Sequence, residues 1–132
     1  MRVLLLVIAI ATILPFCAKK RNEGSVYAGT WELRSADGMM GHVEYEPGNG
    51  FKMVITEDSL YEYTNNGLQY TRTFGVVKDT LVGYGADRLA DRLSPDIIAG
   101  FKTFFELKGN TLTRYVGIPA LDGGSSVYVR IK

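Results

Sequence analysis

The side chains with the clearest capacity for chemistry lie in one loop, where a single histidine follows two methionines. Met39 and Met40 precede His42, and Glu44 follows it. Thioether, imidazole and carboxylate groups together can bind a soft or borderline metal ion. The spacing does not recur elsewhere in the chain, however, and loop methionines commonly pack over the mouth of a barrel. We therefore expect no metal site and no cofactor.

Motifs of the common enzymatic reactions are missing from the sequence. It contains no nucleophile elbow, no phosphate-binding loop and no zinc motif, so we predict that the protein is not an enzyme. Its 132 residues include fifteen Lys and Arg against fourteen Asp and Glu, which suits one nearly neutral domain. Such a charge balance offers no field to attract nucleic acid.

Aromatic residues are the stronger indication of function, because several of them recur at every second position. Side chains two positions apart share one face of a strand. The candidates lie on three such faces, Tyr61 and Tyr63 on one, Tyr70, Arg72 and Phe74 on another, and Phe101 and Phe105 on a third that Thr103 shares. If these faces point inward, they line an apolar cavity with a few polar groups, and the alternative is a solid core made of the same rings. A buried Arg72 would need an anionic partner, whereas an Arg72 at the rim would not.

Short strands separated by turn residues account for most of the chain after residue 27. Residues 28–36 alternate between apolar and polar side chains, as a half-buried strand does. Asn65-Asn66-Gly67 supplies residues that accept positive φ angles, which a tight hairpin requires. We predict eight strands, at 28–36, 51–55, 59–64, 68–77, 80–85, 97–107, 111–117 and 125–132.

Residues 86–94 interrupt this pattern. Leu89 and Leu93 would share one face of a helical turn, which Pro95 would end, and a long loop is the alternative. With at most one short helical turn there, the fold class is all-β. We predict an antiparallel eight-stranded up-and-down barrel, because closure removes the edge strands that otherwise invite aggregation.

The N-terminus has the pattern of a secretory signal. After Arg2, residues 3–13 form an eleven-residue run whose only polar side chain is Thr12. The run is shorter than the ~20 residues that a membrane-spanning helix needs. Leu14-Pro15-Phe16-Cys17 then places the only cysteine directly after the run, and this segment resembles the lipobox of bacterial lipoproteins. The resemblance implies that residues 1–16 are removed and that Cys17 carries a lipid, while a plain secretory signal is the alternative.

A second resemblance begins at Gly29-Thr30-Trp31-Glu32-Leu33, which is similar to the Gly-x-Trp signature of lipocalins and of lipocalin-like domains in bacterial lipoproteins. Further matches are residues 45–50, 108–112, 121–124 and 128–130. The resemblance implies a lipocalin-like barrel over residues 27–132, with Arg130 lying over Trp31 at one end. That contact would be structural.

These patterns together predict an exported lipoprotein of the cell envelope. Cys17 would hold it at a membrane, residues 17–26 would be a tether, and the barrel, as a monomer, would bind a small apolar ligand. The alternative is a solid-core structural or interaction module that contacts an envelope partner through residues 37–49 and 86–99.

Overall fold

The alternating segments form ten β-strands and one 3₁₀ turn in residues 26–132, the part of the chain that the computed structural model describes. The predicted leader, Cys17 and nearly all of the tether lie outside the described residues. The elements are β1 (Gly29–Gly38), β2 (Gly41–Glu44), β3 (Lys52–Ile55), β4 (Ser59–Thr64), β5 (Gly67–Thr73), β6 (Gly75–Leu81), β7 (Arg88–Ser94), β8 (Thr103–Lys108), β9 (Thr111–Val116), η2 (Pro119–Leu121) and β10 (Gly124–Arg130).

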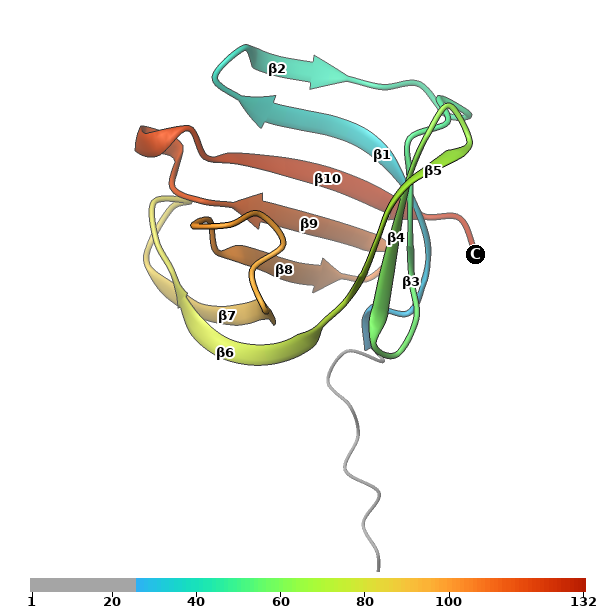
Figure 1. The fold of residues 1–132 in the computed structure, drawn as a ribbon. Coiled ribbons are helices and arrows are strands. Elements are labelled where there is room, and N and C mark those ends of the chain that lie inside the picture. The colour runs from blue at the N-terminus through green and yellow to red at the C-terminus, as the bar shows by residue number, and fades with distance from the viewer. Residues whose placement is uncertain (1–25) are drawn as a thin grey trace, which may run out of the picture.

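The strands form one curled antiparallel sheet (Figure 1). Its order is β5-β4-β3-β1-β10-β9-β8-β7-β6, and β2 pairs only with β1. Most strands that follow each other in sequence are therefore neighbours in the sheet, except β2 with β3 and β5 with β6, and pairing of β1 with β10 joins the two halves. The two ends of the order, β5 and β6, are consecutive in the chain but are not hydrogen-bonded to each other, so the barrel is open there.

The predicted all-β antiparallel fold is confirmed, with more strands than expected. The β4–β5 hairpin lies where the turn residues predict it, and Asn65 and Asn66 have φ angles of 51° and 61°. The added strand β2 forms a hairpin with β1 that projects from one end of the sheet (Figure 1).

Residues 88–94 form strand β7, so both the predicted helical turn and the loop alternative are wrong. Arg88, one of the polar residues of this segment, forms an ion pair with Glu106 of the neighbouring strand β8. Leu93 is buried while Leu89 is exposed. A spacing of four places two leucines on one face of a strand as well as of a helix, so this spacing does not distinguish the two structures.

Three other predicted strands have different limits. The strand expected at 80–85 does not form, because residues 80 and 81 end β6 and residues 82–87 are an irregular connection to β7. The strand expected at 68–77 is divided at Phe74, whose side chain is buried and whose N–H donates to the Asp58 carbonyl oxygen at 2.8 Å. There the chain leaves β5 and begins β6 at the other end of the sheet order. The strand expected at 97–107 begins only at Thr103, because residues 95–102 form a loop.

One face of the sheet carries the main core. Alternation and register place these buried side chains together: Trp31, Leu33, Met53, Ile55, Leu60, Leu93, Phe105, Leu112 and Tyr128. We call this the inner face. Phe104 lies on the opposite face of β8, where it forms a smaller cluster with Leu81 and Ala90.

Candidate functional site

The predicted contact between Trp31 and Arg130 is confirmed. The two residues are opposite each other on β1 and β10, and the guanidinium carbon of Arg130 lies 4.3 Å from the centre of the indole ring. The indole N–H donates to the Tyr27 carbonyl oxygen at 2.8 Å. A Cβ at Gly29 would come within 2.8 Å of the guanidinium, which explains the glycine. The contact closes the core at this point, and a cation over an indole contributes about 0.5–2 kcal/mol.

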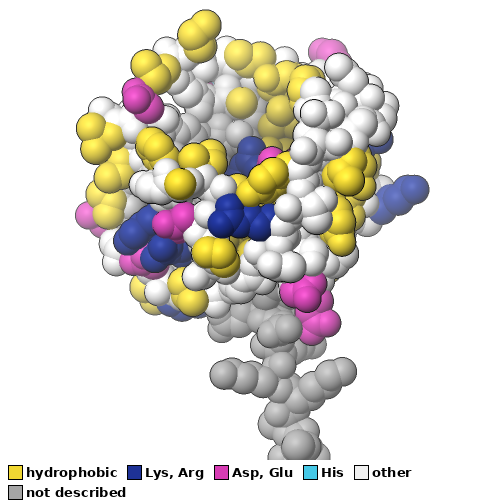
Figure 2. All heavy atoms as spheres, in the orientation of Figure 1, with side chains coloured by type: hydrophobic (Ala, Val, Ile, Leu, Met, Phe, Trp, Pro, Cys, Tyr) yellow, Lys and Arg dark blue, Asp and Glu magenta, His cyan; other side chains and the backbone are white. Residues whose placement is uncertain are grey.

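The inner face also borders a hollow of about 280 Å³, which we call the inner hollow. Five strand residues and two loop residues line it: Glu62 from β4, Tyr70 from β5, Thr103 from β8, Arg114 and Val116 from β9, and Ile97 and Ile98 from the β7–β8 loop. The molecule is hollowed on the side shown in Figure 2, where basic and acidic side chains lie near the centre among hydrophobic ones.

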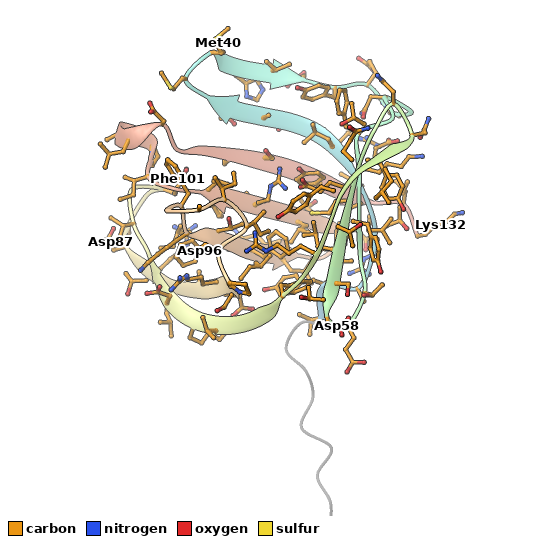
Figure 3. All side chains as sticks on the ribbon, in the orientation of Figure 1. Met40, Asp58, Asp87, Asp96, Phe101 and Lys132 are labelled. Carbon is orange, nitrogen blue, oxygen red and sulfur yellow. The ribbon has the colours of Figure 1, made fainter. Side chains whose placement is uncertain are left out.

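The β7–β8 loop covers this hollow from the open side of the sheet. The loop, which carries Phe101, lies in front of β8 and β9 in Figure 3. Arg72 of β5 fastens it, because its guanidinium donates to the Ile97 carbonyl oxygen at 2.5 Å and to the Tyr70 hydroxyl at 3.0 Å. Within residues 26–132, Arg72 has these oxygen acceptors and no carboxylate partner.

An ion pair between Arg114 and Glu62 lies in the wall of the inner hollow. Burial disfavours the charged guanidinium, but the neighbouring Tyr128 and Glu62 outweigh this and raise the pKa of Arg114 above its ordinary value. Burial also raises the pKa of Tyr128, whose ring centre lies 5.5 Å from the guanidinium carbon of Arg114. A second hollow of about 160 Å³, bordered by Leu33 and Phe51, shares the ion pair as part of its wall.

Two polar atoms in this wall are buried and unpartnered among the described residues. They are the hydroxyl oxygen of Thr103 and Nε of Arg114. Such an atom costs about 1–3 kcal/mol when it is left without a hydrogen bond. Both atoms have practically no accessible surface, so other atoms of these two residues form their share of the lining of the inner hollow.

The predicted aromatic sets are divided between several places. Tyr70 lines the inner hollow and Arg72 fastens its loop, as the shared face predicts. Phe74 and Phe105 are buried in the main core. The register pairs Tyr61 with Val54, on the opposite face from Leu60.

Tyr63 is paired with Lys52 and lies on the same outer face as Tyr61. The structure therefore turns both of these predicted candidates away from the inner face. Tyr63 still borders the smaller of the two hollows that share the ion pair.

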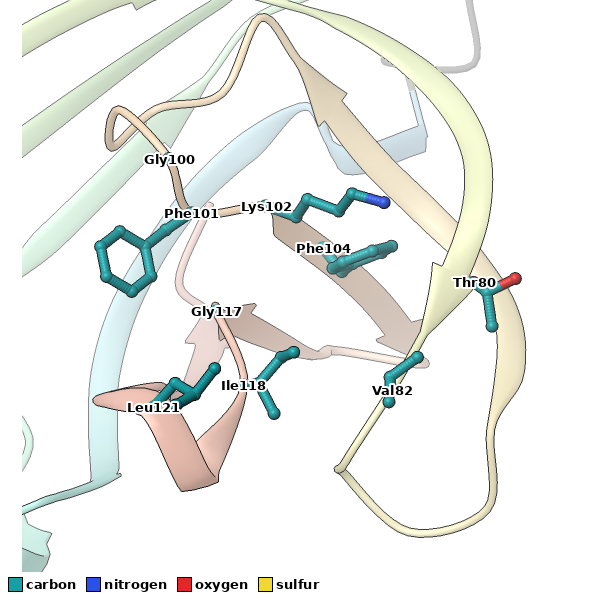
Figure 4. Close-up of a pocket in the computed structure, with 9 residues that line it drawn as sticks. All are labelled: Thr80, Val82, Gly100, Phe101, Lys102, Phe104, Gly117, Ile118 and Leu121. Carbon is teal, nitrogen blue, oxygen red and sulfur yellow. The ribbon is translucent and has the colours of Figure 1, made fainter.

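Phe101 lies in a separate hollow of about 290 Å³ between the end of β6, the β7–β8 loop and the segment leading to η2 (Figure 4). This outer hollow is lined by Thr80, Val82, Gly100, Phe101, Lys102, Phe104, Gly117, Ile118 and Leu121. Phe101 therefore lines the outer hollow, while Phe105 is buried in the main core. The two-residue period had predicted that they share one face.

Glu62 and Arg114 are not among the site residues predicted from the sequence, whereas Thr103 lies on one of the predicted faces. A signal for both was present, because Glu62 follows the core residue Leu60 at two-residue spacing and Arg114 follows Leu112 in the same way. A charged side chain on the same strand face as buried residues lies either at the edge of the core or inside it, paired with an opposite charge. Only the curl of the sheet, which brings β4 across the interior from β9, shows that the two charges meet.

The loop around His42 is a solvent-exposed hairpin. His42 contacts Asp37 at 2.7 Å and Glu44 at 3.5 Å, and Asp37, followed by Glu44, raises the pKa of the imidazole above 6.5. Met39 and Met40 are exposed at the turn. No cluster of three or more metal-ligating side chains occurs in residues 26–132.

Comparisons with known proteins do not assign the chain to a family. No protein-family model, curated protein or solved structure matches the chain. Across the described residues, no helix has both the length and the apolar character of a membrane span.

Proposed function

We propose that this protein is a lipoprotein of the cell envelope whose lipocalin-like barrel binds a small, mostly apolar molecule in the inner hollow. The observation that carries the proposal is the hollow of about 280 Å³ on the core face, lined by Tyr70, Ile97, Ile98 and Val116 beside three polar residues. Apolar walls with a few placed polar groups are typical of small-molecule sites. Its role is binding as a monomer, without catalysis.

The dimensions of the hollow support a small ligand. Ligand pockets commonly span about 300–1,000 Å³, so a hollow of about 280 Å³ lies at the lower limit. The core residues around it are packed, and Phe105 and Leu112 are almost completely buried. The proposed ligand therefore occupies one side of the barrel and does not replace its core.

Export and anchoring rest on the N-terminal sequence. Residues 3–13 are apolar except for Thr12, and Cys17 is the only cysteine of the chain, so a lipidated sulfur would leave no unpaired thiol in an oxidising compartment. Labelling the cells with radioactive palmitate tests this part. We expect incorporation into the wild type and loss of label in Cys17→Ala, and an unlabelled wild type would remove the anchor from the proposal.

Ligand binding can be tested on the full chain purified from its own host, by native mass spectrometry and solvent extraction. Val116→Trp would fill the inner hollow, whereas Val43→Trp would place the same side chain on the exposed hairpin. We expect a small molecule to copurify with the wild type and with Val43→Trp, and to be missing from a folded Val116→Trp. Wild-type protein without a bound molecule, or retention in Val116→Trp, would contradict the proposal.

The β1–β2 hairpin favours a second candidate function, binding of an envelope protein. Met39 is 78% exposed and Met40 is 97% exposed, and Val43 on β2 adds a third exposed apolar side chain. A photo-crosslinking residue at Met40, compared with one at the exposed Asp58 far from the hairpin (Figure 3), tests this candidate. One discrete adduct formed only from position 40 would support it, and identical adducts from both positions would not.

A further inference from the structure

Arg72 carries a positive charge that no carboxylate of residues 26–132 balances. Its side chain is partly buried, and within these residues the guanidinium contacts two oxygen atoms, the carbonyl oxygen of Ile97 and the hydroxyl oxygen of Tyr70. Both contacts are made by Nη1. Because an arginine has five N–H donors, the three on Nε and Nη2 remain without an acceptor in the described part of the chain.

The unused nitrogens of Arg72 are open to solvent. In the described residues, the side-chain polar atoms that are both buried and unpartnered belong to Thr103 and Arg114, and none belongs to Arg72. Nε and Nη2 form one edge of the planar guanidinium, and such an edge can bind both oxygens of a carboxylate. The contacts of Nη1 hold the group in place and leave this edge accessible.

The guanidinium lies at the rim of the inner hollow. Tyr70 and Ile97, the two residues that it contacts, both line the hollow. Arg72 is opposite the core residue Leu60 in the register of β4 and β5, so it is on the inner face, as Tyr70 is. Figure 2 shows basic side chains at the hollowed surface beside hydrophobic ones. A molecule whose apolar part fills the hollow can therefore place its outer end beside Arg72.

The charges around the hollow favour an anion. Glu62 and Arg114, its two charged lining residues, form an ion pair, so their charges cancel. Asp96 lies in the β7–β8 loop, but its carboxylate is paired with Arg92. Among the described residues at this site, the positive charge of Arg72 is the one left over, and it matches a single negative charge. A carboxylate supplies that charge together with two oxygen atoms for the free edge.

We infer that the inner hollow binds a small monocarboxylate with an apolar body, whose carboxylate is held by the free edge of Arg72. This inference rests on the proposed function and names its ligand class. The apolar body would lie against Ile98 and Val116, and the carboxylate would lie at the rim. Arg72 would then have two roles, because Nη1 fastens the β7–β8 loop while Nε and Nη2 bind the ligand.

Three compounds with the same aromatic body and a planar head group of nearly the same size test the charge of the ligand. They are 2-naphthoate, an anion, 2-naphthamide, which is neutral, and 2-naphthamidine, a cation. Their dissociation constants are measured with the full chain, freed of any copurified molecule by solvent exchange, in one non-ionic detergent. We expect 2-naphthoate to bind about tenfold more tightly than the amide, as one charge-assisted contact at a partly exposed place predicts, and the amidine to bind most weakly.

Substitution of Arg72 tests whether the preference arises there. Arg72→Gln removes the charge and also weakens the fastening of the loop, which would lower the affinity for all three compounds. The ratio between anion and amide separates the two effects, because a looser loop alone would leave this ratio at about tenfold. We expect about twofold or less in Arg72→Gln and about threefold or more in Arg72→Lys. Lys108→Gln, which removes the same charge at the exposed end of β8, should retain the full ratio.

A spectroscopic measurement on the unsubstituted chain complements the variants. With ¹⁵N-labelled arginine, the Nε–H signal of Arg72 is assigned by its loss in Arg72→Lys. We expect saturating 2-naphthoate to shift this signal and saturating 2-naphthamide to leave it nearly unchanged. An unshifted signal with 2-naphthoate bound would contradict a contact with Arg72.

The outcomes distinguish this inference from the function on which it rests. Equal affinity for 2-naphthoate and 2-naphthamide, or tightest binding of 2-naphthamidine, would overturn the anionic ligand class while leaving an apolar binding site. A full ratio in Arg72→Gln would overturn the assignment to Arg72, and so would loss of the ratio in Lys108→Gln, because overall charge would then explain the preference. If none of the three compounds binds the wild type, the proposed binding function fails as well.

Discussion

Replacement of the two residues of the Arg114–Glu62 pair, singly and together, should show strong coupling between them. Glu62→Leu leaves the more buried partner, an arginine whose side chain is 19% exposed, without its counter-charge. Arg114→Met leaves a carboxylate that is 30% exposed and better hydrated. Removing one member of a fully buried pair costs about 3–5 kcal/mol, and a surface pair contributes about 0–1 kcal/mol. For this intermediate burial we expect losses of about 2–3 kcal/mol for Glu62→Leu and about 1–2 kcal/mol for Arg114→Met.

The double variant should be close to the wild type in stability. Two apolar side chains of similar size replace the pair without leaving an unpaired charge, which is often neutral or stabilising. The coupling free energy should therefore be about 3–5 kcal/mol, the sum of the two single losses.

Trp31 provides the assay, since it is the only tryptophan and is completely buried. Its fluorescence reports guanidinium-induced unfolding, with Glu46→Gln on the exposed β2–β3 connection as the control that should shift stability by less than about 0.5 kcal/mol. Additive losses in the double variant would refute the reasoning, because they would mean that the two charges do not stabilise each other.

Three further changes test other parts of the structure. Gly29→Ala should lower the free energy of unfolding by about 1–3 kcal/mol, because its methyl group would press on Arg130 at a φ of 150°, and wild-type stability would contradict this. Phe105→Ala should lower it by about 3–5 kcal/mol by leaving a core cavity, and a loss below 1 kcal/mol would mean that the ring is not packed as described. An NMR titration of His42 should give a pKa above 6.5 that falls toward 6.5 in Asp37→Asn; because the folded pKa is raised, the stabilising contact is fully present below pH 6.5 and is lost as the pH rises through that pKa, and an unchanged pKa would contradict the pairing.

The fold was predictable where local patterns and sheet pairing agree. The alternation around Trp31 and the turn at Asn65 and Asn66 specify β1 and the β4–β5 hairpin directly. At residues 88–94, by contrast, the strand depends on partners far away, such as Glu106 of β8, which forms an ion pair with Arg88 and which local spacing does not reveal. The division of the strand at Phe74 likewise depends on a core that forms only after the sheet curls.

The candidate site was less predictable than the fold. Tyr70 and Arg72 share the inner face, as the two-residue period predicts, but the same period could not decide that Tyr61 faces outward. The polar part of the hollow joins Glu62 of β4 to Arg114 of β9, two strands that are separated in the sheet and meet only across the curled interior. A sequence pattern of a single strand contains no information on such a contact.

The most direct test of a ligand in the inner hollow is a measurement of intermolecular nuclear Overhauser effects between the copurified molecule and methyl groups of the protein. The proposal predicts contacts from that molecule to the methyl groups of Ile97, Ile98 and Val116. Contacts instead to Ile118 and Leu121 of the outer hollow, or to no methyl group at all, would contradict it.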